Sequence, residues 1–408
     1  MKHQTIDSKI DYGLDIPSSL ESGILRLFGV ARIEDINDQE KERIRRVLAG
    51  LFSDNSEIDY SVSCREYTLY YLPLNLYKIW RPLMDILYAD RLPTKCKILE
   101  LGSGPGSSTF GLIEFFKYLA YDNHLTEFIL ELTLVEREHE FIAIFNKLYL
   151  DYVKSLPSNL HVDINIKNED AYKFVQECSG AKYDLIIESN MLNPFEGRSD
   201  AILESFVRSL KAIISPHSSV IIIEPAKQSL AVYLKQLKTI MFQQGMHCYS
   251  PCCCPNDECA RFASARIEVK EIGIYSALVA NGFINKALKN HSFEYAVFRN
   301  DKLSKYDYEG TGDDLSKLAA NVGGKIKFKA FILTFANETE DSFSLKICDG
   351  SLCDKSDVWL YIPKSILIED SINCLTSGRG GLVDVKNAIV EGPQNIKCVM
   401  STQLKIYR

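Results

Sequence analysis

The chain has 408 residues, with 47 lysine and arginine side chains against 54 aspartate and glutamate side chains, which gives a formal net charge of −7. A hydrophobic share of 46% and a charged share of 25% are ordinary for a globular protein, so the composition excludes a disordered, collagen-like or miniprotein chain. At roughly 100–200 residues per domain, this length predicts two or three domains. The negative net charge argues against a protein coated in basic residues, but it does not exclude a local basic patch.

Apolar runs are short along the whole sequence. A run such as Val220 to Ile223 falls far below the roughly 18 consecutive apolar residues that span a bilayer. Met1 to Asp15 mixes lysines with aspartates, and it lacks both the apolar stretch of a signal peptide and the acid-free character of a transit peptide. We therefore expect a cytoplasmic protein with no membrane partner.

Residues 1–95 predict a helical N-terminal region. Asp38 to Phe52 carries its apolar residues at helical spacing on one face, with charges opposite: Ile44, Val47, Leu48 and Leu51. Tyr67 to Tyr88 is rich in aromatic residues and contains Pro73 and Pro82, which we expect to break its helices.

Residues 96–300 alternate apolar runs with helical patterns. The runs are continuous or nearly so, which is typical of strands covered on both faces of a parallel sheet. The predicted strands are Lys97 to Leu101, Ile129 to Val135, Val162 to Ile166, Tyr183 to Ile187, Ser219 to Ile223 and, late in the region, Phe293 to Asn300. The pattern predicts an α/β core, interrupted by a cysteine-rich insertion at about residues 245–265.

Residues 301–324 are polar and rich in glycine and aspartate, and we expect a linker there. Residues 325–408 then predict five short strands, which suit a small closed β-barrel of the OB type. The strands are Lys325 to Phe335, Phe343 to Cys348, Val358 to Ile362, Leu382 to Val390 and Ile396 to Ile406. Lys325, Lys327 and Lys329 alternate with apolar residues, and they either protect an edge strand from aggregation or meet the phosphates of a nucleic acid.

A glycine-rich loop follows the first predicted strand of the core. Glu100 and Leu101 run into Gly102-Ser103-Gly104-Pro105-Gly106, and a helix comes next. Glycines allow a tight turn and a close approach of the backbone to a ligand, and the helix N-terminus favours negative groups. This GxGxG spacing after an acidic residue differs from the dinucleotide GxGxxG pattern. It resembles the S-adenosylmethionine loop of class I methyltransferases.

Further polar residues stand where that Rossmann-like fold places cofactor contacts. Glu136 ends the second strand and is predicted to accept from both ribose hydroxyls, and Asp170 follows the third strand and is predicted to accept from the adenine amino group. Glu188 to Asn190 closes the fourth strand at the mouth of the site, and Glu224 closes the fifth. The alternative is a Rossmann-like fold that no longer binds a cofactor. The predicted cofactor-binding set is Glu100, Gly102, Ser103, Gly104, Gly106, Glu136, Asp170, Glu188 and Asn190.

The sequence does not identify catalytic residues. Asn193-Pro194-Phe195 resembles the Asn-Pro-Pro-Phe/Tyr pocket of methyltransferases that act on amino nitrogens, but a helix-starting turn is the alternative interpretation.

Five of the 12 cysteines lie between Cys248 and Cys259, at Cys248, Cys252, Cys253, Cys254 and Cys259. In a reducing compartment such a cluster indicates a metal rather than disulfides, and soft sulfur ligands select an iron–sulfur cluster or Zn²⁺. Adjacent cysteines cannot all point at one metal, so we expect about three of these ligands and a fourth from the turn at Cys348 to Cys353.

Several motifs, in this order, resemble the small-subunit (mitochondrial-type) ribosomal methyltransferase-like family. They are the YLPLNLYKIWRPL helix, ELGSGPGSST, DLIIESNMLN, VIIIEPA, HCYSPC, FEYAVFRN and KICDGSL, spread over residues 65–360. The resemblance implies a class I methyltransferase core with a small β-domain and a [4Fe–4S] cluster, with Zn²⁺ as the alternative. By resemblance Cys252 matches the first ligand and Cys348 the ligand from the β-domain. We assign Cys254 and Cys259 between them, with Cys248 and Cys253 as alternates.

The same resemblance implies an S-adenosylmethionine-binding protein that acts on the small ribosomal subunit or its rRNA, as a methyltransferase or an assembly factor. Two alternatives remain. One is an active methyltransferase for a non-ribosomal protein or small molecule, and the other is a non-catalytic RNA-binding assembly factor. The sequence does not predict the oligomeric state.

Overall fold

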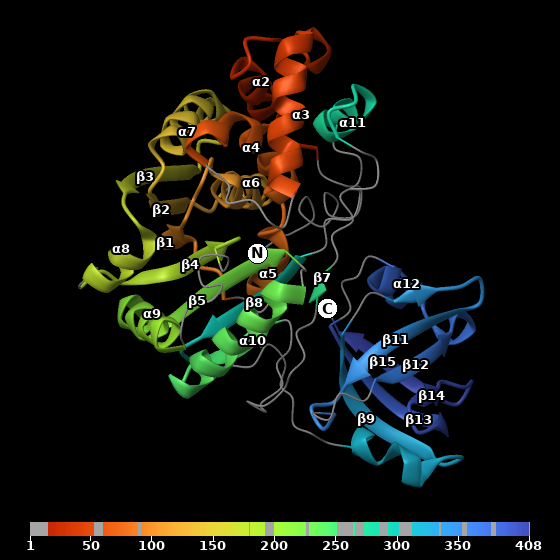
Figure 1. Cartoon of the computed structure of the whole chain (residues 1–408). Coiled ribbons are helices and arrows are strands. Elements are labelled where there is room, and N and C mark those ends of the chain that lie inside the picture. The colour runs from red at the N-terminus through yellow and green to blue at the C-terminus, as the bar shows by residue number, and fades with distance from the viewer. Residues whose placement is uncertain are drawn as a thin grey trace.

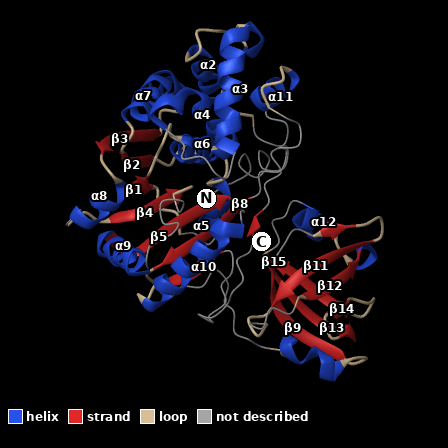
Figure 2. Ribbon diagram, viewed as in Figure 1, coloured by secondary structure: helices blue, strands red, loops and turns tan. Residues whose placement is uncertain are grey.

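The computed structural model describes residues 15–52, 60–88, 91–178, 180–191, 200–225, 228–250, 264–265, 273–284, 293–301, 312–333, 336–352, 357–376 and 381–407. The strands among them form two separate sheets, drawn in red in Figure 2. No helix within the described ranges combines the length and the apolarity that a membrane crossing requires.

The first sheet has the strand order β3-β2-β1-β4-β5-β8-β6, and β7 pairs with β8. The first five strands of this path pair in parallel, whereas β8 lies antiparallel between β5 and β6. This order is that of the class I methyltransferase (Rossmann-like) fold. The strands are β1 (Lys95–Leu101), β2 (Phe128–Glu136), β3 (Leu160–Asn168), β4 (Tyr183–Ser189), β5 (Ile214–Pro225), β6 (His247–Ser250), β7 (Ser264–Ala265) and β8 (Phe293–Arg299).

Helices cover both faces of this sheet (Figure 1). On one face, α5 (Trp80–Tyr88), α6 (Ser107–Asp122) and α7 (His139–Tyr152) contact the strands, with η2 (Val153–Ser155) after α7. An outer layer packs on these helices and extends the same core: α2 (Ser18–Arg26), η1 (Ile33–Asp35), α3 (Asp38–Phe52), α4 (Tyr60–Asn75) and α11 (Gly273–Ala280). The other face packs against α8 (Ala171–Glu177), α9 (Asp200–Ile213) and α10 (Gln228–Gln243). Ile187 belongs to the first of these cores and Ile186 to the second, because successive strand residues point to opposite faces.

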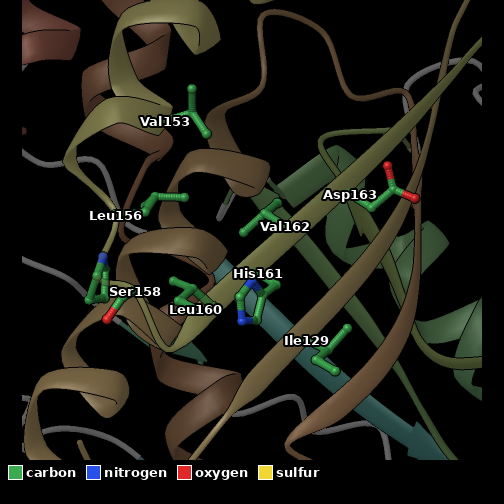
Figure 3. A pocket seen from close by; sticks show the side chains of 9 residues that line it. Ile129, Val153, Leu156, Ser158, Leu160, His161, Val162 and Asp163 are labelled. Carbon is green, nitrogen blue, oxygen red and sulfur yellow. The ribbon is translucent and has the colours of Figure 1, made fainter.

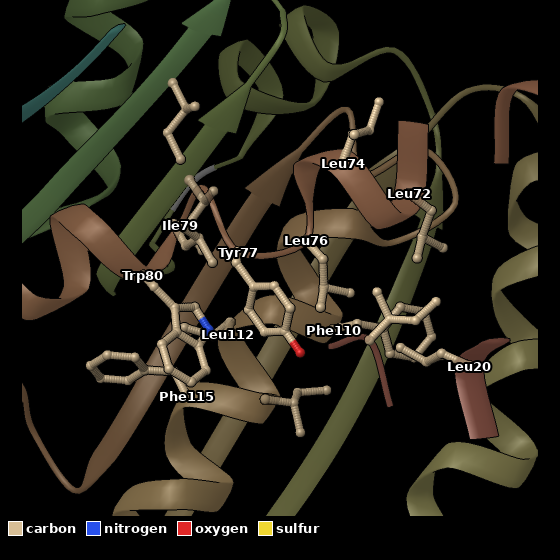
Figure 4. Packing of buried hydrophobic residues seen from close by; sticks show 14 of the residues in the cluster. Leu20, Leu72, Leu74, Leu76, Tyr77, Ile79, Trp80, Phe110, Leu112 and Phe115 are labelled. Carbon is tan, nitrogen blue, oxygen red and sulfur yellow. The ribbon is translucent and has the colours of Figure 1, made fainter. Parts of the chain in front are cut away.

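The N-terminal helices are part of the core of the first sheet, as Figure 4 shows. Trp80 is fully buried, its indole N–H donates to the carbonyl of Gly111 at 2.8 Å, and its ring meets Phe115 edge-on at a centroid distance of 5.4 Å. The predicted helix Asp38–Phe52 is confirmed. The expected breaks at Pro73 and Pro82 are wrong, because α4 continues through Pro73 and α5 holds Pro82 in its first turn, and the break falls at residues 76–79 instead.

The second sheet closes on itself into a barrel. Its pairings run β9 to β11 to β12 to β14 to β13 and back to β9, with β12 and β14 parallel and the others antiparallel. A helix, α12, lies in the chain between β12 and β13, which is the plan of an OB-fold. The elements are η5 (Leu315–Asn321), β9 (Lys325–Ile332), β10 (Asn337–Glu338), β11 (Ser342–Cys348), β12 (Val358–Pro363), η6 (Lys364–Ile366), α12 (Glu369–Thr376), β13 (Leu382–Gly392), β14 (Asn395–Lys397) and β15 (Gln403–Tyr407).

Two details of this half differ from the sequence-based expectation. The last predicted strand, Ile396 to Ile406, is two strands, β14 and β15, separated by a turn at residues 398–402. The expected linker is only partly a linker, because η5 buries Leu315 and Leu318 in the barrel core. Their spacing of three residues is one turn of a 3₁₀-helix, which puts both leucines on the same side.

Candidate cofactor site at the carboxyl ends of the core strands

The glycine loop follows β1 at the point where the strand order reverses. Leu101, the last residue of β1, pairs with Val135 of β2 on one side and with Glu188 of β4 on the other. Open α/β sheets bind ligands at such a switch point, outside the carboxyl ends of the strands. Gly102, Glu136 and Glu188 therefore lie at one edge of the sheet.

The three loop glycines all have positive φ angles, which are 62° at Gly102, 52° at Gly104 and 91° at Gly106. Side chains rarely adopt this backbone conformation, so the turn requires glycine. A Cβ atom at Gly102 would collide with the Met191 sulfur, and one at Gly106 would lie 2.5 Å from Cδ2 of Phe145. A Cβ atom at Gly104 would meet nothing within 4 Å. The middle glycine thus faces open space, as a loop that receives a ligand requires.

Glu136 is the last residue of β2 and is hydrogen-bonded to this loop. The backbone N–H of Gly104 donates to its Oε2 atom at 2.7 Å, and the N–H of Glu138 donates to its Oε1 atom at 2.9 Å. Burial raises the pKa of Glu136, and the two N–H donors oppose that rise. Each carboxylate oxygen has a second lone pair. The carboxylate is thus held in place and can still accept from two hydroxyl groups.

Asp170, the predicted adenine contact, caps the N-terminus of α8. Its Oδ1 atom accepts from the backbone N–H groups of Tyr172 at 3.0 Å and Lys173 at 3.1 Å. The cap uses Oδ1 alone, and the residue is exposed. Asp170 therefore has a structural role, and its contact with a cofactor stays a prediction.

Glu100 and Ser103 lie within the protein. The hydroxyl of Thr109 donates to Oε2 of Glu100, and burial raises the pKa of this carboxyl to about 8 although that bond lowers it. Ser103 is also buried, and its N–H donates to the carbonyl of Val135 at 3.1 Å. Both residues connect the loop to its neighbours, so they position the loop.

Glu188 is the penultimate residue of β4 and is almost fully buried, at 1% exposure. Neither of its carboxylate oxygens has a hydrogen-bond partner within the described part of the chain. Burial and the charge of Glu224 raise its pKa to about 8. An unpartnered buried carboxyl is costly, and it indicates a site whose donor comes from a ligand.

Glu224 and Lys78 complete this buried group. Glu224 is the penultimate residue of β5, and its Oε1 atom accepts from the N–H of Met191 at 2.7 Å. Burial lowers the pKa of Lys78 to about 8, and the negative charge of Glu224 opposes this effect. Lys78 is not among the residues predicted from the sequence. Its signal is one lysine inside the mostly apolar run YLPLNLYKIW, in which Leu72 to Trp80 are all buried.

Asn190 follows β4 with a φ angle of 60°, which is unusual for a residue with a side chain. Its N–H donates to the carbonyl of Ile223 at 2.8 Å, and its Nδ2 atom donates to the Ser189 hydroxyl at 3.1 Å. Such strained conformations gather at binding sites. The Asn193-Pro194-Phe195 motif lies outside the described residues.

The predicted metal ligands are only partly described. Cys252, Cys254 and Cys259, with the alternate Cys253, lie outside the described residues. Cys348 is buried, and the N–H of Gly350 points at its sulfur at 3.4 Å. The sulfur of Cys248 donates to the carbonyl of Ser250 at 3.5 Å. Across the described ranges, no group of three or more potential ligands forms a metal site.

A hollow of about 400 Å³ lies at the opposite end of the sheet, as Figure 3 shows. It is lined by the first residues of β2 and β3, including Ile129 and Leu160, and by Leu156 before them. His161 at its rim lies 3.1 Å from the carboxylate of Glu127. This hollow is therefore separate from the glycine loop.

No protein-family model matches the sequence, and a search of curated proteins finds no match. Three solved structures are similar to parts of it. A SAM-dependent methyltransferase from Agrobacterium tumefaciens is 12% identical, and the match covers 55% of this chain and 62% of that one at a TM-score of 0.35. A methyltransferase from Pyrococcus furiosus is 11% identical over 64% of this chain and 97% of that one, at a TM-score of 0.32. TrmN from Thermus thermophilus is 12% identical over 56% of this chain and 52% of that one, at 0.33.

The chain thus covers less than two thirds of the Agrobacterium structure. The strand order and register of the first sheet define the fold.

Proposed function

We propose that this chain binds S-adenosylmethionine at the carboxyl ends of β1, β2 and β4 and transfers its methyl group. The observation that carries the proposal is the open space over Gly104, next to a carboxylate that the Gly104 N–H itself holds in place. A loop with positive φ angles leads directly into the N-terminus of α6. These features fit a ligand with a ribose and a carboxylate.

The remaining groups suit a ligand that also carries positive charge. S-adenosylmethionine, when bound, supplies a methyl group on a positively charged sulfur. Glu188 has two oxygens without a hydrogen-bond partner among the described residues, and its pKa of about 8 favours the protonated form at neutral pH. A cation nearby would lower that pKa and favour the carboxylate. We therefore assign Glu136 to ribose binding and Glu188 to the cationic part of the ligand.

For the acceptor of the methyl group we propose the small ribosomal subunit or its rRNA. The sequence motifs that resemble the small-subunit ribosomal methyltransferase-like family support this choice, and so does the barrel, since OB-folds commonly bind oligonucleotides. A non-ribosomal substrate and a non-catalytic assembly factor are the competing functions.

We also propose a metal site that joins Cys252, Cys254, Cys259 and Cys348, with a [4Fe–4S] cluster as the first choice and Zn²⁺ as the second. Support among the described residues comes from Cys348. Its sulfur is buried and faces a backbone N–H donor. Hydrogen bonds of this kind stabilise thiolate ligands and tune the cluster they hold.

The experiment that separates these functions combines labelled cofactor with purified small ribosomal subunits. Protein is incubated with methyl-labelled S-adenosylmethionine and subunits, and both label and protein are followed through sedimentation. Label in rRNA supports the proposal. Protein that sediments with the subunit without transferring label supports the assembly factor, and label that enters only other molecules supports a non-ribosomal substrate. Glu136→Ala is the negative control for transfer, because it removes the ribose contact without touching the barrel.

A further inference from the structure

The lysines on the outer surface of the barrel fall into two groups. Four lysines have a carboxylate partner: Lys317 with Asp314, Lys346 with Asp357, Lys364 with Glu338 and Lys397 with Glu391. Five others lie on β9, β13 and β15, which are neighbouring strands in Figure 1, and we call them the lysine face: Lys325, Lys327, Lys329, Lys386 and Lys405. No ion pair occurs in the described structure for Lys325, Lys327, Lys386 or Lys405, and all four are exposed.

The strand register places like charges opposite each other on this face. Lys327 of β9 pairs directly with Lys386 of β13, and like charges in such a position destabilise a sheet. Lys329 pairs with Asp384, which in turn pairs with Lys405 of β15. Within the described strands, Asp384 is thus the one carboxylate in register with these five lysines, and the carboxylate of Asp313 lies beside β9 on the backbone N–H of Lys327. The arrangement is unfavourable for the barrel alone and becomes favourable when an anion covers the face.

The edge-strand explanation for the β9 lysines does not hold at the middle of the strand. One side of β9 pairs with β13 along its length. On the other side, Asp313 accepts the Lys327 N–H through Oδ2 at 2.8 Å, and its own N–H donates to the Lys327 carbonyl at 2.6 Å. Because the backbone of Lys327 is satisfied on this side, its side chain is not needed to protect an open edge.

We propose that the lysine face binds the phosphate backbone of a single-stranded RNA. The proposal deepens the proposed function, because it identifies the surface on which the RNA partner would lie. Lysines repeat every second residue along β9, about 6.7 Å apart, and neighbouring strands lie about 4.8 Å apart, so the charges form a regular grid. A regularly charged, extended backbone matches that grid.

An aromatic ring at the end of the grid favours nucleic acid over an acidic peptide. The Nζ atom of Lys405 lies 4.4 Å from the ring centre of Tyr407, which is partly exposed. Single-strand-binding proteins combine a basic track with aromatic rings on which bases stack. OB-folds usually bind oligonucleotides over their second and third strands, here β11 and β12. There the outward Lys346 is neutralised by Asp357 at 2.7 Å. The positive charge available to a phosphate backbone therefore lies on the other side of the barrel, at the lysine face.

The test measures binding of the full chain to a fluorescent oligouridylate of about 12 nucleotides, a length within the usual site size of an OB-fold, as a function of salt. Lys327→Gln with Lys386→Gln is compared with Lys346→Gln with Lys397→Gln, a control that removes the same charge from paired lysines. The lysine-face variant should lower the slope of log affinity against log salt by about 1.4, at about 0.7 per phosphate contact. Its melting temperature should not fall, since the substitution relieves repulsion.

Three results would overturn the proposal: an unchanged slope in the lysine-face variant, a larger loss in the control variant, or equal affinity of the wild-type protein for poly-glutamate of the same charge. S-adenosylmethionine binding is titrated on the same proteins. Failure of that binding with normal RNA binding would count against the proposed cofactor, whereas failure of RNA binding alone would count against this face.

Discussion

The backbone N–H of Gly104 donates to the Oε2 atom of Glu136 at 2.7 Å, and this bond joins the loop after β1 to the end of β2. The carboxylate is thereby aimed before any ligand arrives. Preorganisation of this kind lowers the cost of ordering a side chain on binding. The strength of ligand binding should therefore depend on Glu136 more than on any acid elsewhere along β2.

The first prediction follows from that bond. Glu136→Ala removes two acceptors for the ribose, a loss on the order of 2–3 kcal/mol. The Kd for S-adenosylhomocysteine should rise roughly 30- to 150-fold in calorimetry. Glu131→Ala is the control, since Glu131 lies in the middle of the same strand and its ion pairs in the described structure are with the exposed Lys95 and Lys97. Equal affinities in the two variants would remove Glu136 from the site.

The second prediction separates two glycines of one loop. Gly104→Ala places a methyl group in open space, so the protein should fold with a strain of roughly 1–2 kcal/mol from the left-handed backbone. It should lose ligand binding, because the methyl group fills the space the ligand needs. Gly106→Ala carries the same kind of backbone strain and also meets Phe145 at 2.5 Å, so its melting temperature should fall further. Normal binding by Gly104→Ala would show that the ligand lies elsewhere.

The third prediction concerns pH and Glu188. Its pKa is about 8 in the folded protein against an ordinary value of 4.5, so the folded state holds the proton more tightly. The stability that the protonated carboxyl contributes is complete below pH 4.5 and is lost as the pH rises through about 8. The Glu188→Gln side chain cannot ionise. The free energy of unfolding of this variant should therefore rise relative to wild type as the pH increases, by an amount on the order of a few kcal/mol at about pH 8.

Urea unfolding at a series of pH values measures this difference directly. Glu100, whose pKa is also about 8, is present in both proteins and cancels in the comparison. A difference between Glu188→Gln and wild type that does not change with pH would contradict the assigned protonation.

Much of the core could be predicted from the sequence because its strands are buried on both faces. The runs KILEL and YDLII need no tertiary information to indicate strands, and β1 and β4 contain them. The positions of Glu136 and Glu188 at strand ends followed from the same runs. The barrel circuit was harder to predict, since β14 has only three residues and pairs with β12 across a long sequence separation.

The roles of individual acids could not be predicted, because they depend on partners distant in sequence. Nothing local shows that Glu188 lacks a donor among the described residues, or that Lys78, in the turn between α4 and α5, is held near Glu224. Asp170 was chosen for its place after a strand, but it also precedes a helix, and the helix N-terminus takes one of its oxygens. When one residue fits two local patterns, here a ligand contact after a strand and a helix cap, only the structure shows which role it has.

The fourth prediction tests the metal proposal. Protein purified without oxygen should be brown, and Cys348→Ser should lose both the colour and the bound iron. Cys398→Ser is the matched control, because Cys398 is equally buried in the barrel and burial raises its thiol pKa to about 12, which keeps it protonated. A colourless protein with one equivalent of zinc that Cys348→Ser releases would replace the cluster with Zn²⁺. Metal content equal in wild type and Cys348→Ser would remove this residue from the site.

The most direct test of the cofactor site is calorimetry of the wild-type chain with S-adenosylmethionine and S-adenosylhomocysteine, alongside Glu136→Ala. Glu136 is held by the N–H of Gly104, and Glu188 offers two buried oxygens without donors in the described structure. We expect both ligands to bind with one site per chain, and Glu136→Ala to weaken both. Absence of heat and of any thermal shift with either ligand at millimolar concentration would mean that the fold has kept its loop and lost its cofactor.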